Sequence, residues 1–252
     1  MTEPGEREHG AEMRWDRFWA GHLFLHTHIA KTGGTTLTAA LIDLAGGPCL
    51  DLRGRKLHVR DLDAGERDRL RVISGHVFHG LERHFERQVL YVAAVRDPVR
   101  REVSRYRFLQ TQPDHPAHKA VAGRTFAEAW KALLAFRGED QMRNGQCQQL
   151  TGRVLPHRLR RWEVQQRLRK DYFLVIPVDR LGEAIEALYR AFGRPVPEAR
   201  RENVSIAPPV DVPPDLAGEI RSMNDLDDWM VGVAGRVFEE RLADAIAYLW
   251  TV

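Results

Sequence analysis

Cysteine is scarce in this chain, where only Cys49 and Cys147 occur among 252 residues. Their isolated positions exclude a disulfide framework and a cysteine-based zinc site, and they fit a reduced compartment. The sequence also lacks the basic and apolar segments of a signal peptide. No apolar run approaches the ~20 residues that a membrane-spanning helix needs. We therefore expect a soluble, cytoplasmic protein.

A large charge of one sign is lacking as well. Lys and Arg number 38 against 35 Asp and Glu, which leaves a net charge of +3. Aromatic residues make up only 8% and do not interleave with the arginines, so we do not expect nucleic acid as a partner. Basic residues do outnumber acidic ones between Arg83 and Arg107, and this favours a local site for an anion.

The bulk composition is typical of a globular protein, with 43% hydrophobic and 29% charged residues. A length of 252 residues is enough for one large domain and too short for two comfortable ones. Residues 1–14 are polar and offer no periodic apolar face, which predicts a mobile N-terminal tail. We expect residues 15–252 to form one domain, and the sequence leaves the oligomeric state open.

Apolar, β-branched runs alternate with helical patterns along the chain, which predicts an α/β fold with a central, mostly parallel sheet flanked by helices. The run over 89–95 is apolar throughout, as is typical of a strand buried on both faces. Asp97 and Pro98 then supply a helix N-cap and first position. The predicted strands are 23–29, 71–74, 89–95 and 172–178; the predicted helices begin after 34 and cover 98–109, 125–136, 140–150, 157–170, 179–192 and 226–249, with 110–123 and 194–214 irregular.

The first motif lies between a predicted strand and a predicted helix and runs from His28 to Thr36 as His-Ile-Ala-Lys-Thr-Gly-Gly-Thr-Thr. Gly33 and Gly34 allow backbone N–H groups to close around an anion, and the following helix adds a favourable dipole. Lys31 supplies a positive charge. The lysine precedes the glycines, whereas the Walker A loop ends in Gly-Lys-Ser/Thr. The motif indicates a P-loop-like phosphate site.

The second motif is Arg96-Asp97-Pro98 at the end of the strand over 89–95, followed by Ser104 on the next helix. Just over two helical turns separate Arg96 from Ser104, so the two side chains can share one face. The forked guanidinium of Arg96 suits a phosphate, to which Ser104 would donate a hydrogen bond. The spacing therefore predicts a second anion pocket.

Together the two motifs resemble those of sulfotransferases that use 3′-phosphoadenosine 5′-phosphosulfate (PAPS), in particular the carbohydrate-type group related to heparan sulfate 2-O-sulfotransferase and to bacterial sulfotransferases. The loop of that family usually reads His-Ile-Pro-Lys-Thr-Gly-Gly-Thr-Ser. Ala30 and Thr36 replace its proline and serine here, which keeps the backbone path and the hydroxyl. The resemblance implies a sulfotransferase with PAPS as donor. It assigns the 5′-phosphosulfate to Lys31, Thr32, Gly33, Gly34, Thr35 and Thr36, and the 3′-phosphate to Arg96 and Ser104.

Further strings resemble the same family more faintly. Ser74-Gly-His76 resembles the segment that carries the general base, so His76 is the expected base and Lys31 the expected catalytic cation. An acidic residue remains an alternative base. Because a sulfonate carries less negative charge than a terminal phosphate, we expect no metal. Five other polar residues stand in such strings: His79, Asn144, Gln146, Asn203 and Ser205. The sequence leaves open whether any of them contacts the substrate or the nucleotide.

The resemblance implies in-line transfer of a sulfonate to a hydroxyl of a carbohydrate or a glycosylated or other small molecule. Two alternatives remain. A P-loop nucleotide kinase would bind phosphate after the first strand as well, although the position of Lys31 argues against it. A non-catalytic protein that binds PAPS or its product, 3′,5′-diphosphoadenosine, would keep Lys31 and Arg96 but would not need His76.

Overall fold

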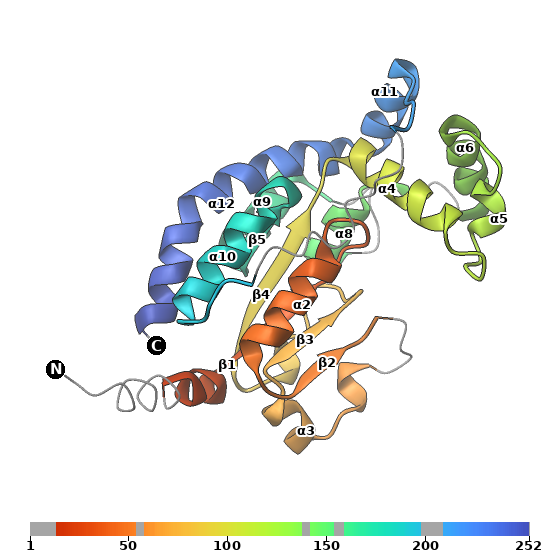
Figure 1. Cartoon of the computed structure of the whole chain (residues 1–252). Coiled ribbons are helices and arrows are strands. Elements are labelled where there is room, and N and C mark those ends of the chain that lie inside the picture. Colours follow the sequence, from red (N-terminus) through yellow and green to blue (C-terminus); the bar gives the residue numbers. More distant parts are fainter. Residues whose placement is uncertain (1–13, 54–57, 138–141, 154–158, 198–208, 252) are drawn as a thin grey trace.

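The computed structural model describes residues 14–53, 58–137, 142–153, 159–197 and 209–251. At its centre lies a five-stranded sheet in which every neighbouring pair is parallel, in the order β2-β3-β1-β4-β5 (Figure 1). The predicted α/β class and parallel sheet are confirmed. The strands are β1 His22–Thr27, β2 Cys49–Asp51, β3 Val72–Gly75, β4 Gln88–Val95 and β5 Tyr172–Pro177.

Helices cover both faces of this sheet, because alternate residues of each central strand point to opposite sides. In β4, Leu90, Val92 and Ala94 pack into one core with the first helix after β1. Tyr91 and Ala93 pack into the other core. The long last helix contributes to both cores (Figure 1). The covering helices are α2 Gly34–Ala45, α8 Gly145–Thr151, α9 Arg161–Lys170, α10 Leu181–Ala191 and α12 Asp225–Thr251.

A separate helical lobe stands beyond the carboxyl ends of the strands (Figure 1). Its own core includes Trp130, Leu133 and Ile220, all buried. Its helices are α4 Pro98–Gln110, α5 His118–Val121, α6 Phe126–Arg137 and α11 Pro214–Met223. The start of α4 is as predicted: Asp97 accepts a hydrogen bond from the backbone of Arg100, and Pro98 takes the first position. The segment 110–123, predicted as irregular, contains the short helix α5.

Several boundaries differ from the prediction for local reasons. Residues 140–141 and 157–158, where two helices were predicted to begin, lie outside the described residues. Helix α8 begins at Gly145, because Asn144 has a left-handed backbone with φ 45°, and α9 begins at Arg161, after the extended Arg160. A 3-10 turn over Val178–Arg180 precedes α10. Three elements were not predicted: the strand β2, the helix α3 Ala64–Arg69 and the helix α11. Of the segment predicted as irregular over 194–214, residues 198–208 lie outside the described residues.

Of the predicted tail, residues 1–13 lie outside the described residues, and the first described residues, 14–21, are helical. This helix packs beside the end of α12, because Arg14 donates a hydrogen bond to the carbonyl oxygen of Leu249. Across the ranges that the structure describes, no helix combines the length and the apolar character needed to cross a bilayer.

Candidate active site

Three loops meet at the carboxyl edge of the sheet. Strand β1 lies between β3 and β4, with Thr27 in register with Gly75 on one side and with Ala93 on the other. The chain therefore leaves three neighbouring strands at one place, where the connections diverge to opposite sides of β1. In open α/β sheets such a point is where ligands bind. It brings together Lys31, His76 and Arg96, which lie far apart in the sequence.

The loop after β1 has a backbone that only certain residues tolerate. Lys31 and Gly33 adopt positive φ angles of 70° and 86°. A Cβ atom at Gly33 would also lie 2.9 Å from the side chain of Leu181. At Gly34 it would lie 2.3 Å from the ring of His28, which packs beneath the helix start. The glycines therefore let the loop close tightly over its own histidine and the start of α10.

The first turn of α2 offers donors to a ligand. Gly33 takes the N-cap position, and no side chain in the described part of the chain caps this helix. The buried hydroxyl of Thr32 donates instead to the carbonyl oxygen of Ile29, at 2.9 Å, and so holds the loop together. Thr35 is exposed and Thr36 half-buried on the first turn. An uncapped N-terminus with a positive dipole end is a site for an anion.

Lys31 and Arg96 lie on the same side of this loop. Nη1 of Arg96 donates to the carbonyl oxygen of Lys31 at 3.3 Å, and Nζ of Lys31 rests 4.1 Å above the ring centroid of Phe108. Burial, and then the positive charges of Arg96 and Arg105, lower the pKa of Lys31. Nε of Arg96 is buried without a hydrogen-bond partner among the described residues. A buried cationic donor in this state fits an incoming anion.

His76 reaches the loop from the other side. Its exposed ring follows β3, and Nδ1 lies 2.7 Å from the carbonyl oxygen of His28. A carbonyl oxygen only accepts hydrogen bonds, so Nδ1 carries the proton and the lone pair is on Nε2. The ring of His28 lies 5.1 Å from that of His76. Burial, followed by the charges of His76 and Arg53, lowers the pKa of His28 to about 4, so this neighbour is neutral at pH 7.

Residues 20–154, more than half of the 252-residue chain, match the sequence profile of the sulfotransferase family. The chain belongs to the sulfotransferase family. The matched stretch contains the loop after β1, His76 and Arg96, so the family assignment and the convergence of the three loops concern the same part of the molecule. No curated protein matches the chain. Family membership means that this protein transfers sulfonyl groups.

Gln146 supports Arg96 in this sulfotransferase. Its fully buried amide pairs with both backbone groups of Arg96: Nε2 donates to the carbonyl oxygen at 2.7 Å, and Oε1 accepts from the backbone N–H at 2.9 Å. The position of this side chain, which the sequence left open, is thus in the scaffold that fixes the end of β4.

A buried reciprocal cap holds α8, which carries Gln146, against α12. Asp227 accepts hydrogen bonds from the backbone of Gln146 at 3.0 Å and of Cys147 at 2.8 Å. Asn144 Oδ1 in turn accepts from the backbone of Leu226 and of Asp227, each at 3.0 Å. Each helix therefore caps the other with a side chain from its own start. Asn144, like Gln146, belongs to the scaffold.

Arg101 links this cap to the loop after β1, called the anion loop below. Its Nε donates to the carbonyl oxygen of Ala30 at 3.1 Å, and its Nη1 lies 3.9 Å from Asp227. Burial raises the pKa of Asp227, and the charge of Arg101 opposes that rise. Sequence reasoning missed both residues as site residues. Arg101 stands inside the second motif, but its contact with the loop after β1 depends on tertiary packing, and Asp227 lies outside the stretch that matches the family.

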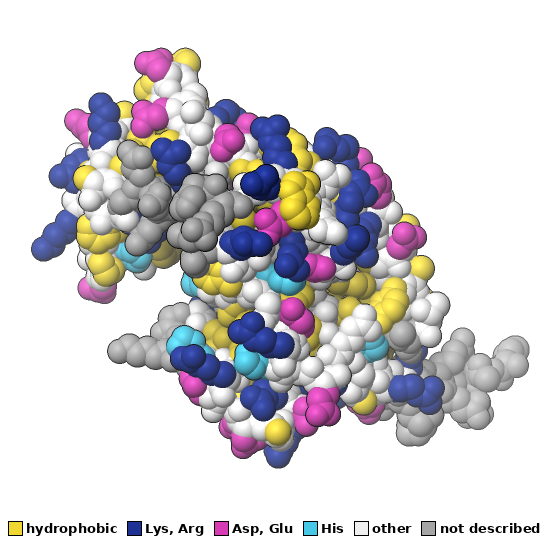
Figure 2. Space-filling model, turned by 180° about the vertical axis from the view of Figure 1, so that it is seen from behind, with side chains coloured by type: hydrophobic (Ala, Val, Ile, Leu, Met, Phe, Trp, Pro, Cys, Tyr) yellow, Lys and Arg dark blue, Asp and Glu magenta, His cyan; other side chains and the backbone are white. Residues whose placement is uncertain are grey.

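The remaining predicted residues are placed as follows. Ser104 lies half-buried on α4, two turns after Arg96. His79 stacks on Tyr91 with ring centroids 4.6 Å apart, and its Nε2 lies 3.6 Å from Asp171, so its ring is held by the scaffold. Asn203 and Ser205 lie outside the described residues. On the face opposite to Figure 1, a hollow lies below the helical lobe, and basic and histidine side chains gather along it (Figure 2).

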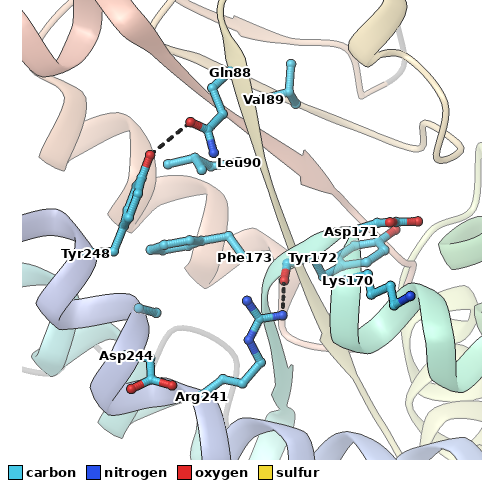
Figure 3. Close-up of a pocket in the computed structure, with 11 residues that line it drawn as sticks. Gln88, Val89, Leu90, Lys170, Asp171, Tyr172, Phe173, Arg241, Asp244 and Tyr248 are labelled. Atoms are coloured by element: carbon cyan, nitrogen blue, oxygen red, sulfur yellow. Dashed lines mark hydrogen bonds between the residues drawn. The ribbon is translucent and has the colours of Figure 1, made fainter.

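A cavity of about 360 Å³ lies at the other edge of the sheet, at the starts of β4 and β5 beside α12 (Figure 3). None of the predicted site residues lines it. Two of its polar side chains are paired within the protein: Tyr248 donates to Gln88 Oε1 at 2.9 Å, and Arg241 donates to the carbonyl oxygens of Tyr172 and Arg169. The candidate site at the carboxyl edge is therefore separate from this cavity.

Proposed function

We propose that this sulfotransferase uses PAPS as its donor and transfers the sulfonate to a hydroxyl of a carbohydrate or of a glycosylated small molecule. The observation that carries the proposal is the convergence of Lys31, Arg96 and His76 around the loop after β1. The two cations occupy one side of the loop and the base the other.

The hydrogen-bond donors and cations of the site fit a nucleotide that carries an anionic group at each of two positions. The uncapped start of α2 and Lys31 suit the 5′-phosphosulfate, since backbone donors and a flexible cation can follow a charge that grows during the reaction. Arg96 suits the 3′-phosphate because its buried Nε has no partner among the described residues. Gln146 and Arg101 keep the two pockets in a fixed relation.

The chemistry follows from these positions. Bound PAPS would supply an activated sulfonate, whose bond to the bridging phosphate oxygen breaks while a bond to the acceptor oxygen forms. Nε2 of His76 accepts the proton that the acceptor hydroxyl loses, because Nδ1 already carries a proton for His28. Lys31 and the first amides of α2 stabilise the negative charge that remains on the leaving phosphate. A metal ion is not needed for these roles.

The acceptor is proposed from the family resemblance and from the surface beside the base. Phe78 follows His76 by two residues and is 38% exposed. An exposed aromatic ring in the segment that carries the proposed base offers the apolar face of a sugar a surface to lie on. A hydroxyl-bearing sugar or glycosylated metabolite therefore suits this side of the site.

Calorimetry with 3′,5′-diphosphoadenosine, ATP and AMP tests the donor. We expect the wild type to prefer the 3′-phosphorylated ligand, and Lys31→Ala and Arg96→Ala each to weaken its binding by about 10- to 100-fold. Equal binding of ATP, with magnesium-dependent turnover, would favour a nucleotide kinase. Transfer from PAPS across a library of sugar and non-sugar hydroxyl acceptors then tests the acceptor class. Binding of PAPS with no transfer to any acceptor would favour a non-catalytic binding protein.

A further inference from the structure

Arg53 stands at the carboxyl end of β2 in a fixed orientation. Its Nε lies 3.0 Å and 2.9 Å from the two carboxylate oxygens of Asp51, and its Nη2 lies 2.5 Å from Oδ2. The backbone N–H of Arg53 also donates to Oδ1 at 3.0 Å. Nε and Nη2 of the guanidinium are thus held by the two oxygens of one carboxylate. A side chain fixed in this way loses little further freedom when it binds a ligand.

The remaining nitrogen of this guanidinium points to the anion loop. Nη1 of Arg53 donates to the hydroxyl of Thr35 at 3.2 Å, on the exposed first turn of α2. The charge of Arg53 also contributes to the lowered pKa of His28, after burial and the charge of His76. Arg53 therefore acts electrostatically on His28, which lies in the same loop as Lys31.

The order of the strands determines which part of a bound PAPS molecule Arg53 can reach. Strands β2 and β3 lie on one side of β1, and β4 lies on the other. Lys31 leans towards the β4 side, where it meets Arg96 and Phe108. His76 follows β3, so an acceptor hydroxyl in contact with its Nε2 approaches from the side of β3 and β2. The group under attack must lie between that hydroxyl and the leaving phosphate.

We propose that Arg53 is a further catalytic residue, which donates to the oxygens of the sulfonate during transfer, with Asp51 as the residue that positions it. The proposal rests on the proposed use of PAPS. Lys31 and Arg53 then bind neighbouring groups from opposite sides of the loop, the leaving phosphate and the sulfonate respectively. The hydroxyl of Thr35 is the contact that Arg53 exchanges for the ligand.

This arrangement also answers whether Asp51 could be the base. Partial burial raises the pKa of its carboxyl, but the hydrogen bonds and charge of Arg53 outweigh that effect and hold the pKa below its ordinary value. Its oxygens already accept from Arg53. Asp51 thus stays ionised and occupied, and the role of base falls to His76.

The test compares two nucleotides that differ only in the sulfonate. Without acceptor, we expect Arg53→Ala to weaken the binding of PAPS by about 10-fold and that of 3′,5′-diphosphoadenosine by less than about 2-fold. With acceptor, the transfer rate should fall by about 100-fold. Asp51→Asn should lower the rate less than Arg53→Ala does. Arg169→Ala is the matched control, because Arg169 forms a similar ion pair with Glu240 next to the start of β5; it should change neither affinity nor rate.

Equal losses of affinity for both nucleotides would overturn the proposal, because Arg53 would then act on a phosphate or on the shape of the loop. An unchanged transfer rate would overturn it as well. If Arg53→Ala does not fold, Arg53→Lys decides, since it keeps the charge without the fork and should bind 3′,5′-diphosphoadenosine normally but transfer about 10-fold more slowly. A wild type that binds neither nucleotide overturns the proposed function itself, and this inference with it.

Discussion

The two edges of the sheet differ in how their polar groups are satisfied. At the amino edge, Arg241 donates to backbone carbonyls and Tyr248 to Gln88 around an open cavity. At the carboxyl edge, Arg96 has a buried Nε without a partner among the described residues, and α2 begins without a side-chain cap. The amino edge has the cavity, whereas the carboxyl edge combines an uncapped helix start with a buried, unpaired cationic donor. Arg87, just before β4, also has a buried Nε without a partner among the described residues, but its other nitrogens donate to four backbone carbonyl oxygens.

The difference teaches that a candidate anion site is recognised by several donors that converge with their hydrogen bonds unmet, here at the start of α2 and at Arg96, rather than by its volume. Buried donors without partners cost free energy and persist where a ligand satisfies them. The cavity at the amino edge has no such donors among the side chains named above. The predictions below separate the edges by the size and kind of effect that a substitution has at each.

The largest effect is expected for His76→Ala. Removing a general base lowers the rate of proton transfer, so sulfonate transfer should fall by about 1,000-fold. The affinity for 3′,5′-diphosphoadenosine should not change, because the proposed mechanism places the ring against the acceptor and not against the nucleotide. Steady-state kinetics with calorimetry measures both, with His84→Ala as the control. A transfer rate within a few-fold of the wild type would contradict the assignment.

The next effect is expected for Asp227→Ala, which removes the carboxylate that caps α8 and faces Arg101. Leaving two buried backbone donors unpaired, and the buried Arg101 with Glu102 as its remaining carboxylate neighbour, should lower the free energy of unfolding by about 3 kcal/mol. Asp227→Asn should cost less and still weaken nucleotide binding, because the cap holds Gln146 against Arg96. Denaturant unfolding gives the stability. Asp244→Ala, exposed on the same helix, should change it by less than about 0.5 kcal/mol.

Acid should destabilise the carboxyl edge through its buried histidines. Burial, followed by the charge of His28, lowers the pKa of His26, and burial, followed by the charge of His76, lowers that of His28 to about 4. Between pH 6.5 and pH 4.5 the unfolded chain takes up protons that the folded chain refuses, so the free energy of unfolding should fall by roughly 2 kcal/mol. His28→Gln should flatten this pH dependence, as measured by thermal unfolding across the range. An unchanged slope would show that other groups cause it.

The smallest effect on function is expected at the amino edge. Arg241→Ala removes hydrogen bonds to the carbonyl oxygens of Arg169 and Tyr172 and should lower the free energy of unfolding by about 1 kcal/mol. The transfer rate and the affinity for 3′,5′-diphosphoadenosine should remain those of the wild type. A loss of nucleotide affinity in this variant would mean that the cavity, and not the carboxyl edge, takes part in binding.

Much of the fold could be predicted because the long elements carry strong local patterns. The buried run of β4 and the Asp97-Pro98 start of α4 are read from neighbouring residues, and the structure has both. Strand β2 has only three residues, too few for a periodic pattern. The start of α8 depends on the left-handed backbone of Asn144, which is stabilised by contacts to α12 some 80 residues away.

The residues of the candidate site also fall into those that the sequence predicts and those that only the tertiary structure reveals. Lys31 and Arg96 stand in strings at strand ends, so the sequence predicts them, and parallel pairing brings them together. Arg53 and Asp227 act through positions that only the strand order and the packing of α12 create. The domain boundary at residue 15 and the cytoplasmic location stay predictions.

A crystal structure of the complex with 3′,5′-diphosphoadenosine tests the central claim most directly. The account predicts one nucleotide across the carboxyl edge, with its 5′-phosphate at Lys31 and the first turn of α2 and its 3′-phosphate at Arg96. A nucleotide bound in the cavity beside Arg241, or one whose two phosphates both lie at the same pocket, would contradict it.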